Sequence, residues 1–150
     1  APLDFCIGVA GYPEKHFEAP NMEQDLIYLK QKVDAGADYI VTQMFFDNQV
    51  YYKFVEKCRD AGITVPIIPG LKPINLLNQL TVLPKIFNID IPQQLASELS
   101  KCKTNDDAAK VGTNWAIEQA KDLVAGKIPS LHIYTYGVSD NVKEIVKAVF

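Results

Sequence analysis

The stretch DLIYLKQKVDAGADYIVTQMFFDN, residues 25–48, contains the change of hydrophobic period that decides the fold class. Its first part belongs to a predicted helix over residues 22–35, in which Met22, Leu26, Leu29 and Val33 recur at helical spacing. The run over residues 38–43 that follows is short and apolar, as in a buried strand. A helix that leads directly into such a strand is typical of parallel α/β sheets, because each parallel crossover needs a helix.

The same alternation continues on both sides of this stretch. Further strands are predicted at residues 5–10, 65–69 and 130–135, and further helices at residues 49–61, 93–99 and 106–125, with one more after residue 140. A less regular helical region carries Leu76, Leu80, Leu83 and Ile86, and the helices between the last two strands form an insertion. Four βα units are half of an eight-unit barrel or a small open doubly wound sheet, and periodicity does not choose between these architectures.

Composition indicates one soluble globular domain over residues 1–150. The chain is 48% hydrophobic and 22% charged, and no low-complexity linker divides it. Its formal net charge of -3 gives no reason to expect a nucleic acid or an anionic membrane as a partner. No apolar run approaches the roughly 20 residues of a membrane span. The chain begins almost at once with a strand and has no initiator methionine, so we expect it to be cut from a longer protein.

Three cysteines, Cys6, Cys58 and Cys102, are widely spaced and form no CxxC motif. This pattern fits reduced thiols in a cytoplasmic protein better than a disulfide framework or a metal site. We therefore expect all three to be packing residues.

Polar side chains follow the predicted strands, at the end where parallel α/β proteins bind ligands. Gln43 ends the second strand, and its amide offers a donor and an acceptor to a flat heterocycle, or else satisfies backbone groups there. His16 lies in a loop before a helix and suits a phosphate or ribose, although a surface histidine is the simpler interpretation. Asp25 and Lys32 are two helical turns apart and either reach along one dinucleotide or form a solvated face.

Two further residues invite a catalytic interpretation that the pattern does not favour. Lys72 follows the third strand, and a depressed pKa would suit Schiff-base chemistry, but its position in a loop after Gly70 argues against burial. His132 alternates with Leu131 and Ile133, which predicts a core histidine bonded to a neighbour.

Four segments carry a resemblance to a known family: IGVAGYPEKHFEAP, DLIYLKQKVDAGADYIVTQMFFDN, GITVPIIPGLKPI and LHIYTYG. They occur in the order and with the spacing of methylenetetrahydrofolate reductases, and the resemblance covers nearly the whole chain. It implies the C-terminal half of a (βα)8 barrel of the TIM type rather than an open sheet. It also implies flavin adenine dinucleotide (FAD) as the cofactor.

The resemblance further implies which positions contact ligands. The positions that match contacts of the FAD are Ala10, Tyr12, His16, Asp25, Tyr28, Gln31 and Lys32. The positions that match contacts of the folate are Gln43, Tyr51, Gln79 and Leu83. Relatives often carry an Asn-Arg pair where this chain has Gly137 and Val138, so no arginine contact transfers to that point.

The implied reaction is reduction of 5,10-methylenetetrahydrofolate to 5-methyltetrahydrofolate, a step of one-carbon metabolism that supplies methionine synthesis. Reduced NAD(P)H passes hydride to the flavin and leaves, and the folate then accepts the hydride. The family's glutamate acid and the aspartate near the flavin belong to strands outside this chain, and Glu14 and Asp47 do not match them. We therefore expect no catalytic residue here, and no activity without the N-terminal half of the barrel.

Two alternatives stay open. A half-barrel has two unpaired strand edges, so this chain is either part of the reductase or a non-catalytic unit that folds, dimerises through those edges and at most binds flavin. A barrel enzyme for a phosphorylated substrate would need phosphate-gripping glycines after its last strands, and YTYGVSDN supplies one glycine only.

Overall fold

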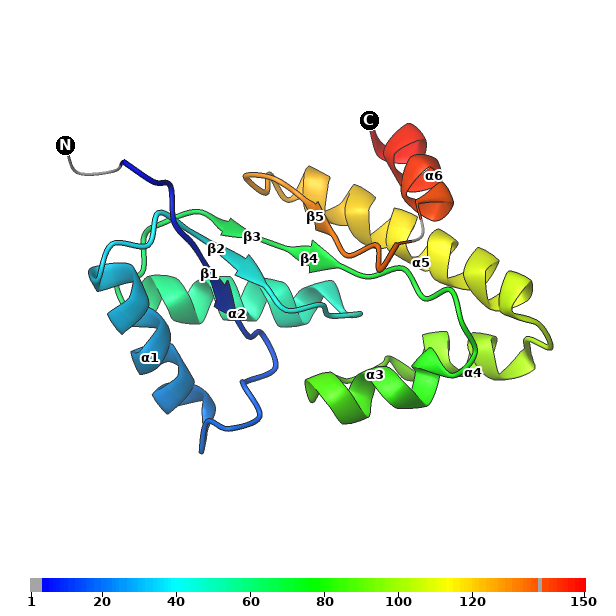
Figure 1. Cartoon of the computed structure of the whole chain (residues 1–150), viewed down its shortest axis with the longest axis horizontal. Helices are drawn as coiled ribbons and strands as arrows, with labels where there is room; N and C mark the ends of the chain where they lie inside the picture. Colours follow the sequence, from blue (N-terminus) through cyan, green and yellow to red (C-terminus); the bar gives the residue numbers. More distant parts are fainter. Residues whose placement is uncertain (1–3, 138) are drawn as a thin grey trace.

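The computed structural model describes residues 4–137 and 139–150, in which helices and short strands alternate (Figure 1). The strands are β1 (Gly8–Gly11), β2 (Tyr39–Thr42), β3 (Ile67–Ile68), β4 (Gly70–Leu71) and β5 (His132–Ile133). The helices are α1 (Met22–Asp34), α2 (Asn48–Asp60), α3 (Gln79–Phe87), α4 (Gln93–Lys101), α5 (Asn105–Ala125) and α6 (Asp140–Val149). The predicted alternation is confirmed, although the strands are shorter than the apolar runs suggested.

The strands are all paired in parallel. β2 lies between β1 and β3, and β4 pairs with β5. The predicted third strand, residues 65–69, contains β3 only, and β4 begins directly after Pro69, where the ladder is interrupted because proline has no N–H to donate. Two of the hydrogen bonds that join the two halves of the sheet, β1–β3 and β4–β5, lie beside this break: the carbonyl oxygen of Pro69 accepts from His132 N at 3.0 Å, and Thr42 Oγ1 accepts from Gly70 N at 2.9 Å. The parallel order is therefore β1, β2, β3 with β4, then β5.

Two hydrophobic cores hold these elements. The first lies between the sheet and its helices and contains Leu29, Ile40, Phe45, Tyr51, Phe54, Cys58, Ile63, Ile67, Leu71, Ala116, Ala120, Leu123 and Ile145. The second joins α3, α4 and the start of α5 to the segment after β2 and contains Met44, Phe46, Ile74, Leu83, Ile89, Leu95, Leu99 and Ala108. In Figure 1, α3 and α4 lie beyond the arrowheads of the strands, so the second core packs near the carboxyl ends of the strands.

Helix α5 spans both cores, and local sequence signals set its position. Thr104 and Asp107 form the expected capping box, with Thr104 Oγ1 accepting from Asp107 N at 3.1 Å and Asp107 Oδ2 accepting from Thr104 N at 3.2 Å. At Gly112, an added Cβ would lie 2.0 Å from the carbonyl oxygen of Ile74. Glycine is required there because the helix contacts the loop backbone directly.

The cysteines behave differently from one another. Cys58 is fully buried in the first core, Cys102 packs against the second, and Cys6 is exposed. The expectation of a packing role is therefore wrong for Cys6, because it lies before β1, where no element covers it. Within residues 4–137 and 139–150, no cluster of metal-ligating side chains occurs and no helix is both long and apolar enough to cross a membrane.

Candidate functional site

The loop after β1 is held in place by bonds to backbone groups. Asp25 Oδ2 accepts from His16 N at 2.8 Å, and the Lys15 ammonium donates to the carbonyl oxygens of His16 and Ala19 at 2.9 and 2.6 Å. The Tyr12 and His16 rings meet edge to face with centroids 4.5 Å apart. Asp25 on α1 therefore fixes the backbone of His16, as the carboxylate is near enough to make a charge-assisted hydrogen bond.

Four of the predicted cofactor positions line one small hollow at the end of β1. These four positions are Ala10, Tyr12, Asp25 and Lys32. The other residues that line the hollow are Gly11, Leu29 and Phe54. Burial and the nearby Asp25 carboxylate raise the pKa of Tyr12, so its hydroxyl stays protonated and available as a donor. The structure thus brings His16, Asp25 and Lys32 together at this end of the sheet, as expected, while their cofactor role stays a prediction.

Tyr28 and Gln31 are not part of that group. Tyr28 is 46% exposed on α1. Gln31 lines a separate hollow with Glu23, Leu26, Ile27, Lys30 and Ala61. The hollow that gathers the other predicted positions does not include these two side chains.

Gln43 follows β2 at its carboxyl end. Its N–H donates to the carbonyl oxygen of Gly11 at 2.8 Å, which extends the pairing of β1 and β2. Its side-chain Oε1 accepts from Met44 N at 2.9 Å, so the amide oxygen satisfies a backbone group at the strand end. No bond from Gln43 Nε2 is found within the described residues, which leaves the NH₂ group as the part able to meet a ligand.

The other three predicted folate positions are engaged in local structure. Gln79 Oε1 accepts from Asn75 N at 2.9 Å at the start of α3. Leu83 is buried in the second core. Tyr51 is buried in the first core, where its hydroxyl donates to the carbonyl oxygen of Ile67 at 2.8 Å and its ring stacks on Phe45. Tyr51 therefore packs α2 on the sheet, and the geometry gives its expected substrate contact no support.

Lys72 and His132 both differ from expectation. Lys72 is only 2% exposed although it follows β4 in a loop, and its ammonium donates to the carbonyl oxygen of Pro73 at 2.8 Å. Burial lowers its pKa to about 8. His132 is exposed rather than in the core, and its ring meets Tyr134 with centroids 4.6 Å apart. Alternation along β5 assigned His132 to one face correctly, but no element covers that face within the described residues.

Tyr134 joins the two halves of the sheet near this point. Its hydroxyl donates to the carbonyl oxygen of Thr42 at 2.8 Å, across from β5 to β2. Burial raises its pKa, and the neighbouring Tyr136 and Tyr12 add to that shift. The Tyr134 side chain therefore connects the end of β5 to the end of β2. Gly137 has a φ of +85°, and Val138 lies outside the described residues.

Glu14 is a residue that motif matching set aside. Its Oε1 accepts from Asp90 N at 2.9 Å, which joins the loop after β1 to the loop before α4. Burial raises its pKa to about 7 against that bond, with help from the charges of Asp90 and Asp47. Its Oε2 is buried and has no partner within the described residues. The only sequence signal for Glu14 was a carboxylate shortly after a strand. Its partner Asp90 is 76 positions away, so no local pattern predicts their contact.

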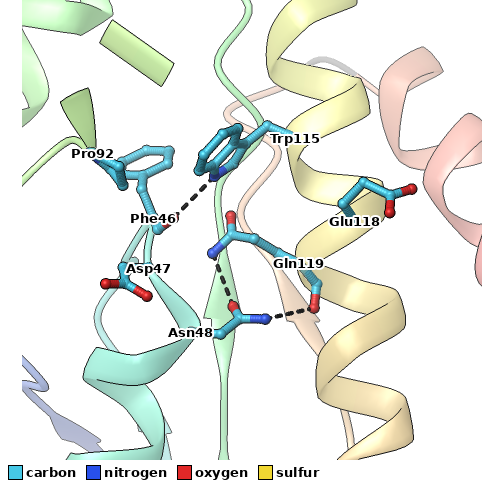
Figure 2. A pocket seen from close by; sticks show the side chains of 7 residues that line it. All are labelled: Phe46, Asp47, Asn48, Pro92, Trp115, Glu118 and Gln119. Atoms are coloured by element: carbon cyan, nitrogen blue, oxygen red, sulfur yellow. Dashed lines mark hydrogen bonds between the residues drawn. The ribbon is translucent and has the colours of Figure 1, made fainter. Parts of the chain in front are cut away.

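A cavity with a volume of about 320 Å³ lies beside the loop after β2. Phe46, Pro92 and Trp115 form its apolar walls, and Trp115 Nε1 donates to the carbonyl oxygen of Phe46 at 2.9 Å (Figure 2). Asn48 and Gln119 bond to each other across it, with Gln119 Nε2 donating to Asn48 Oδ1 at 3.1 Å. These two amides satisfy one another, and the carboxylates of Asp47 and Glu118 also border the cavity (Figure 2).

Comparisons with known proteins agree with the resemblance. The family model described as methylenetetrahydrofolate reductase matches residues 3–149. A probable methylenetetrahydrofolate reductase (NADPH) of Caenorhabditis elegans is 43% identical over 147 residues, which are 97% of this chain and 22% of that protein. The 5,10-methylenetetrahydrofolate reductase of Escherichia coli is 40% identical over 133 residues, which are 88% of this chain and 45% of that protein.

A solved structure shares the fold at low identity. It is described as an uncharacterized protein from Clostridium thermocellum that binds two copies of 5-methyl-5,6,7,8-tetrahydrofolic acid. Its TM-score is 0.61 at 19% identity, over 97% of this chain and 53% of that chain. The chain therefore spans a quarter to a half of the length of these proteins. Because the family model covers nearly all of its residues, this chain belongs to the methylenetetrahydrofolate reductase family.

Proposed function

We propose that this chain is the C-terminal half of the catalytic barrel of a reductase that converts 5,10-methylenetetrahydrofolate into 5-methyltetrahydrofolate. The observation that carries the proposal is the family match over residues 3–149, together with relatives that are named as reductases using NADH or NADPH. Hydride from NAD(P)H would reach the folate through FAD. The three thiols, which form no disulfide, support a cytoplasmic location.

The half-barrel assignment rests on the strand edges. Among the described residues, β1 pairs only with β2 and β5 pairs only with β4, so both outer strands have an open edge. Open edges attract other strands, and a closed barrel removes them. The chain also matches 53% of its structural neighbour and 45% of its E. coli relative, which is the share expected of a half. We propose that the N-terminal half of the same protein closes both edges.

The residues at the end of β1 suit a flavin dinucleotide. The backbone at His16 is fixed by Asp25, and the Lys32 side chain borders the same hollow, so a cation, an imidazole and a donor phenol at Tyr12 are available to phosphate and ribose groups. When bound, FAD supplies the hydride relay of the reaction. These residues would bind and orient it, and Tyr28 and Gln31 would contribute only from the exposed surface of α1.

Gln43 is the group that we assign to the pterin. The structural neighbour binds a methylated tetrahydrofolate, and Gln43 lies at the strand end where ligands of parallel α/β folds are held. Its Oε1 is already bonded to Met44 N, so recognition would depend on the Nε2 donor. Gln79 and Leu83 on α3 would support the folate indirectly, through the loop and the second core.

The test is Gln43→Glu in the complete reductase, because a carboxylate keeps the shape and loses the donor. Folate-dependent reoxidation should slow by about 10- to 100-fold, the usual effect of one lost buried donor. Flavin reduction by NAD(P)H should change by less than about 2-fold. Rapid-mixing absorbance separates the two half-reactions, and Gln93→Glu on the exposed start of α4 is the matched control. Equal losses in both half-reactions would refute the pterin assignment.

A second experiment separates the reductase from a self-contained half-barrel. Residues 1–150 alone should produce methylfolate at least about 100-fold more slowly than the complete reductase, because a missing general acid costs about 10²- to 10⁴-fold. Turnover within about tenfold of the complete protein would show that the site is complete in this chain. A stable dimer that binds flavin without turnover would favour the non-catalytic alternative.

A further inference from the structure

Tyr136 is an exposed aromatic side chain at the end of the sheet that binds ligands. It follows β5 by three positions and is 61% exposed. Its backbone has a φ of +47°, the left-handed region that a tyrosine rarely occupies, and Gly137 continues the turn with a φ of +85°. Such strained positions collect at ligand sites, where the rest of the fold holds them.

A buried lysine lies beneath the Tyr136 ring. The Lys72 ammonium lies 5.3 Å from the centroid of the Tyr136 ring, within the range of a cation–π contact. Its hydrogen bond is to the carbonyl oxygen of Pro73, at 2.8 Å. Among residues 4–137 and 139–150, no carboxylate lies within ion-pair distance of it. A buried cation without a counter-ion is costly, so the ring is its main source of electrostatic compensation.

We propose that the exposed face of Tyr136 is a stacking platform for the pterin ring of the folate, and that Lys72 is a positioning residue that holds this platform from below. The proposal rests on the function proposed above and adds a residue to which the resemblance assigns no ligand contact. The ammonium lies over the ring and the side chain is 61% exposed, so a flat heterocycle would stack on the ring surface that the ammonium does not cover. Gln43 then reads the edge of the same ring system.

The charge of Lys72 makes the platform sensitive to pH. Burial lowers the pKa of Lys72 to about 8, so the ammonium is present at pH 7 and lost above pH 8. The titratable side chains of β5 and of the segment after it that lie near Lys72 are those of His132, Tyr134 and Tyr136. Burial raises the pKa of Tyr134, so its hydroxyl stays protonated through this range.

The experiment measures substrate use and ligand binding in the complete reductase. Tyr136→Leu should raise the KM for 5,10-methylenetetrahydrofolate and the Kd for 5-methyltetrahydrofolate by about 3- to 10-fold, and Tyr136→Phe should leave both unchanged. The KM for NAD(P)H in flavin reduction should stay the same. Phe5→Leu is the matched control, since Phe5 is an exposed aromatic before β1, at the opposite end of the strands.

Lys72 variants test the positioning role. Lys72→Met should raise the KM for the folate by about 2- to 5-fold at pH 7, and Lys72→Arg should restore it, because arginine keeps a cation for the ring. Unmutated protein should approach the Lys72→Met value as the pH rises through 8, whereas Lys72→Arg should not. A purely structural role would show no such pH dependence.

The outcomes separate the two proposals. If the unmutated protein binds no 5-methyltetrahydrofolate, the proposed function fails, and the platform fails with it. If it binds the folate and Tyr136→Leu binds equally well, only the platform is refuted. If Tyr136→Leu instead weakens FAD binding and not folate binding, the open face stacks on the flavin, which also refutes the assignment to the pterin.

Discussion

At the carboxyl ends of the strands, the charged side chains beside β1 have different surroundings from the one beside β4 and β5. Beside β1, the Asp25 carboxylate accepts from His16 N, and the Lys15 ammonium donates to two carbonyl oxygens. Beside β4 and β5, Lys72 is buried with one carbonyl and one aromatic ring as its partners. The first arrangement stabilises the loop that carries it. The second costs stability, because the protein interior solvates an ammonium poorly.

This difference shows where motif matching is informative. The side beside β1 matches the family's motif, and the structure gathers most of its matched positions in one hollow. The side beside β5 departs from the motif after Tyr134, where Asn-Arg is replaced by Gly137 and Val138. The burial of Lys72 beside Tyr136 became visible only in the packing.

The largest expected effect on stability is a gain from Lys72→Met. Methionine fills a similar volume without a charge, and a pKa of about 8 against the ordinary 10.5 corresponds to a cost of about 3 kcal/mol at pH 7. The lost bond to Pro73 offsets about 1 kcal/mol of that gain. Urea unfolding of the chain at pH 7 should therefore show a net stabilisation of about 2 kcal/mol. A destabilised variant would mean that the ring compensates the charge fully.

The same substitution predicts a pH signature. Because the folded pKa of Lys72 lies below the unfolded one, the stability linked to its neutral form is complete above about pH 10.5 and is lost as the pH falls through 8. Unmutated protein should become more stable between pH 8 and 10.5 relative to Lys72→Met. Parallel stability curves over that interval would contradict this linkage.

On the opposite side, Asp25→Ala should destabilise the chain by about 2 kcal/mol, the usual value of a hydrogen bond to a charged group. Asp25→Asn keeps an oxygen acceptor for His16 N and should lose about half as much. Thermal unfolding of both variants gives the comparison. If Asp25→Ala and Lys72→Met changed stability in the same direction, the contrast between the two sides would not hold.

Glu14→Gln should stabilise the chain by about 1 to 2 kcal/mol at pH 8, because the partial exposure of Glu14 lets solvent screen part of the cost of its charge, and should have little effect at pH 4. The folded pKa of Glu14, about 7, exceeds the ordinary 4.5, so its protonated form contributes stability that is complete below 4.5 and lost as the pH rises through 7. Glutamine keeps the acceptor for Asp90 N and removes the charge. Denaturant unfolding at the two pH values checks this, and an equal effect at both would rule out titration as the cause.

The smallest expected effect is that of Tyr134→Phe, which removes the hydroxyl bonded to the carbonyl oxygen of Thr42. The loss should be about 1 kcal/mol, as for other neutral hydrogen bonds. Tyr52→Phe is a useful comparison, since its hydroxyl bonds to Asp122 outside the ligand-binding end. Both should be measured by urea unfolding. A much larger loss for Tyr134→Phe would indicate that this bond, rather than the pairing at Pro69 and Gly70, joins the two halves of the sheet.

Much of the fold followed from local patterns. Helical spacing located α1 and α2 to within a residue or two, and the Thr104–Asp107 pair fixed the start of α5. These features depend on neighbours within one turn of chain. The break at Pro69 was missed because an apolar run looks continuous, whereas ladder hydrogen bonds depend on which strand lies alongside.

For the site, the sequence could name residues but not their surroundings. It placed Gln43 and His16 after the ends of strands correctly, because in parallel α/β folds those ends share one side of the sheet. It assigned Lys72 to an exposed loop and His132 to the core, and both were wrong. Alternation along a strand predicts which way a side chain points. Whether that side chain is buried also depends on which other segments pack against it.

The sequence by itself therefore determined the family, the βα order, the helix caps and the end of the sheet at which chemistry lies, because each is encoded in local spacing or in a long co-linear match. Only the tertiary structure decided that Lys72 is buried beneath Tyr136, and that Glu14 bonds to Asp90 across 76 positions of sequence. Solvation of a charge depends on every atom around it. Those atoms come from segments whose proximity no local pattern specifies.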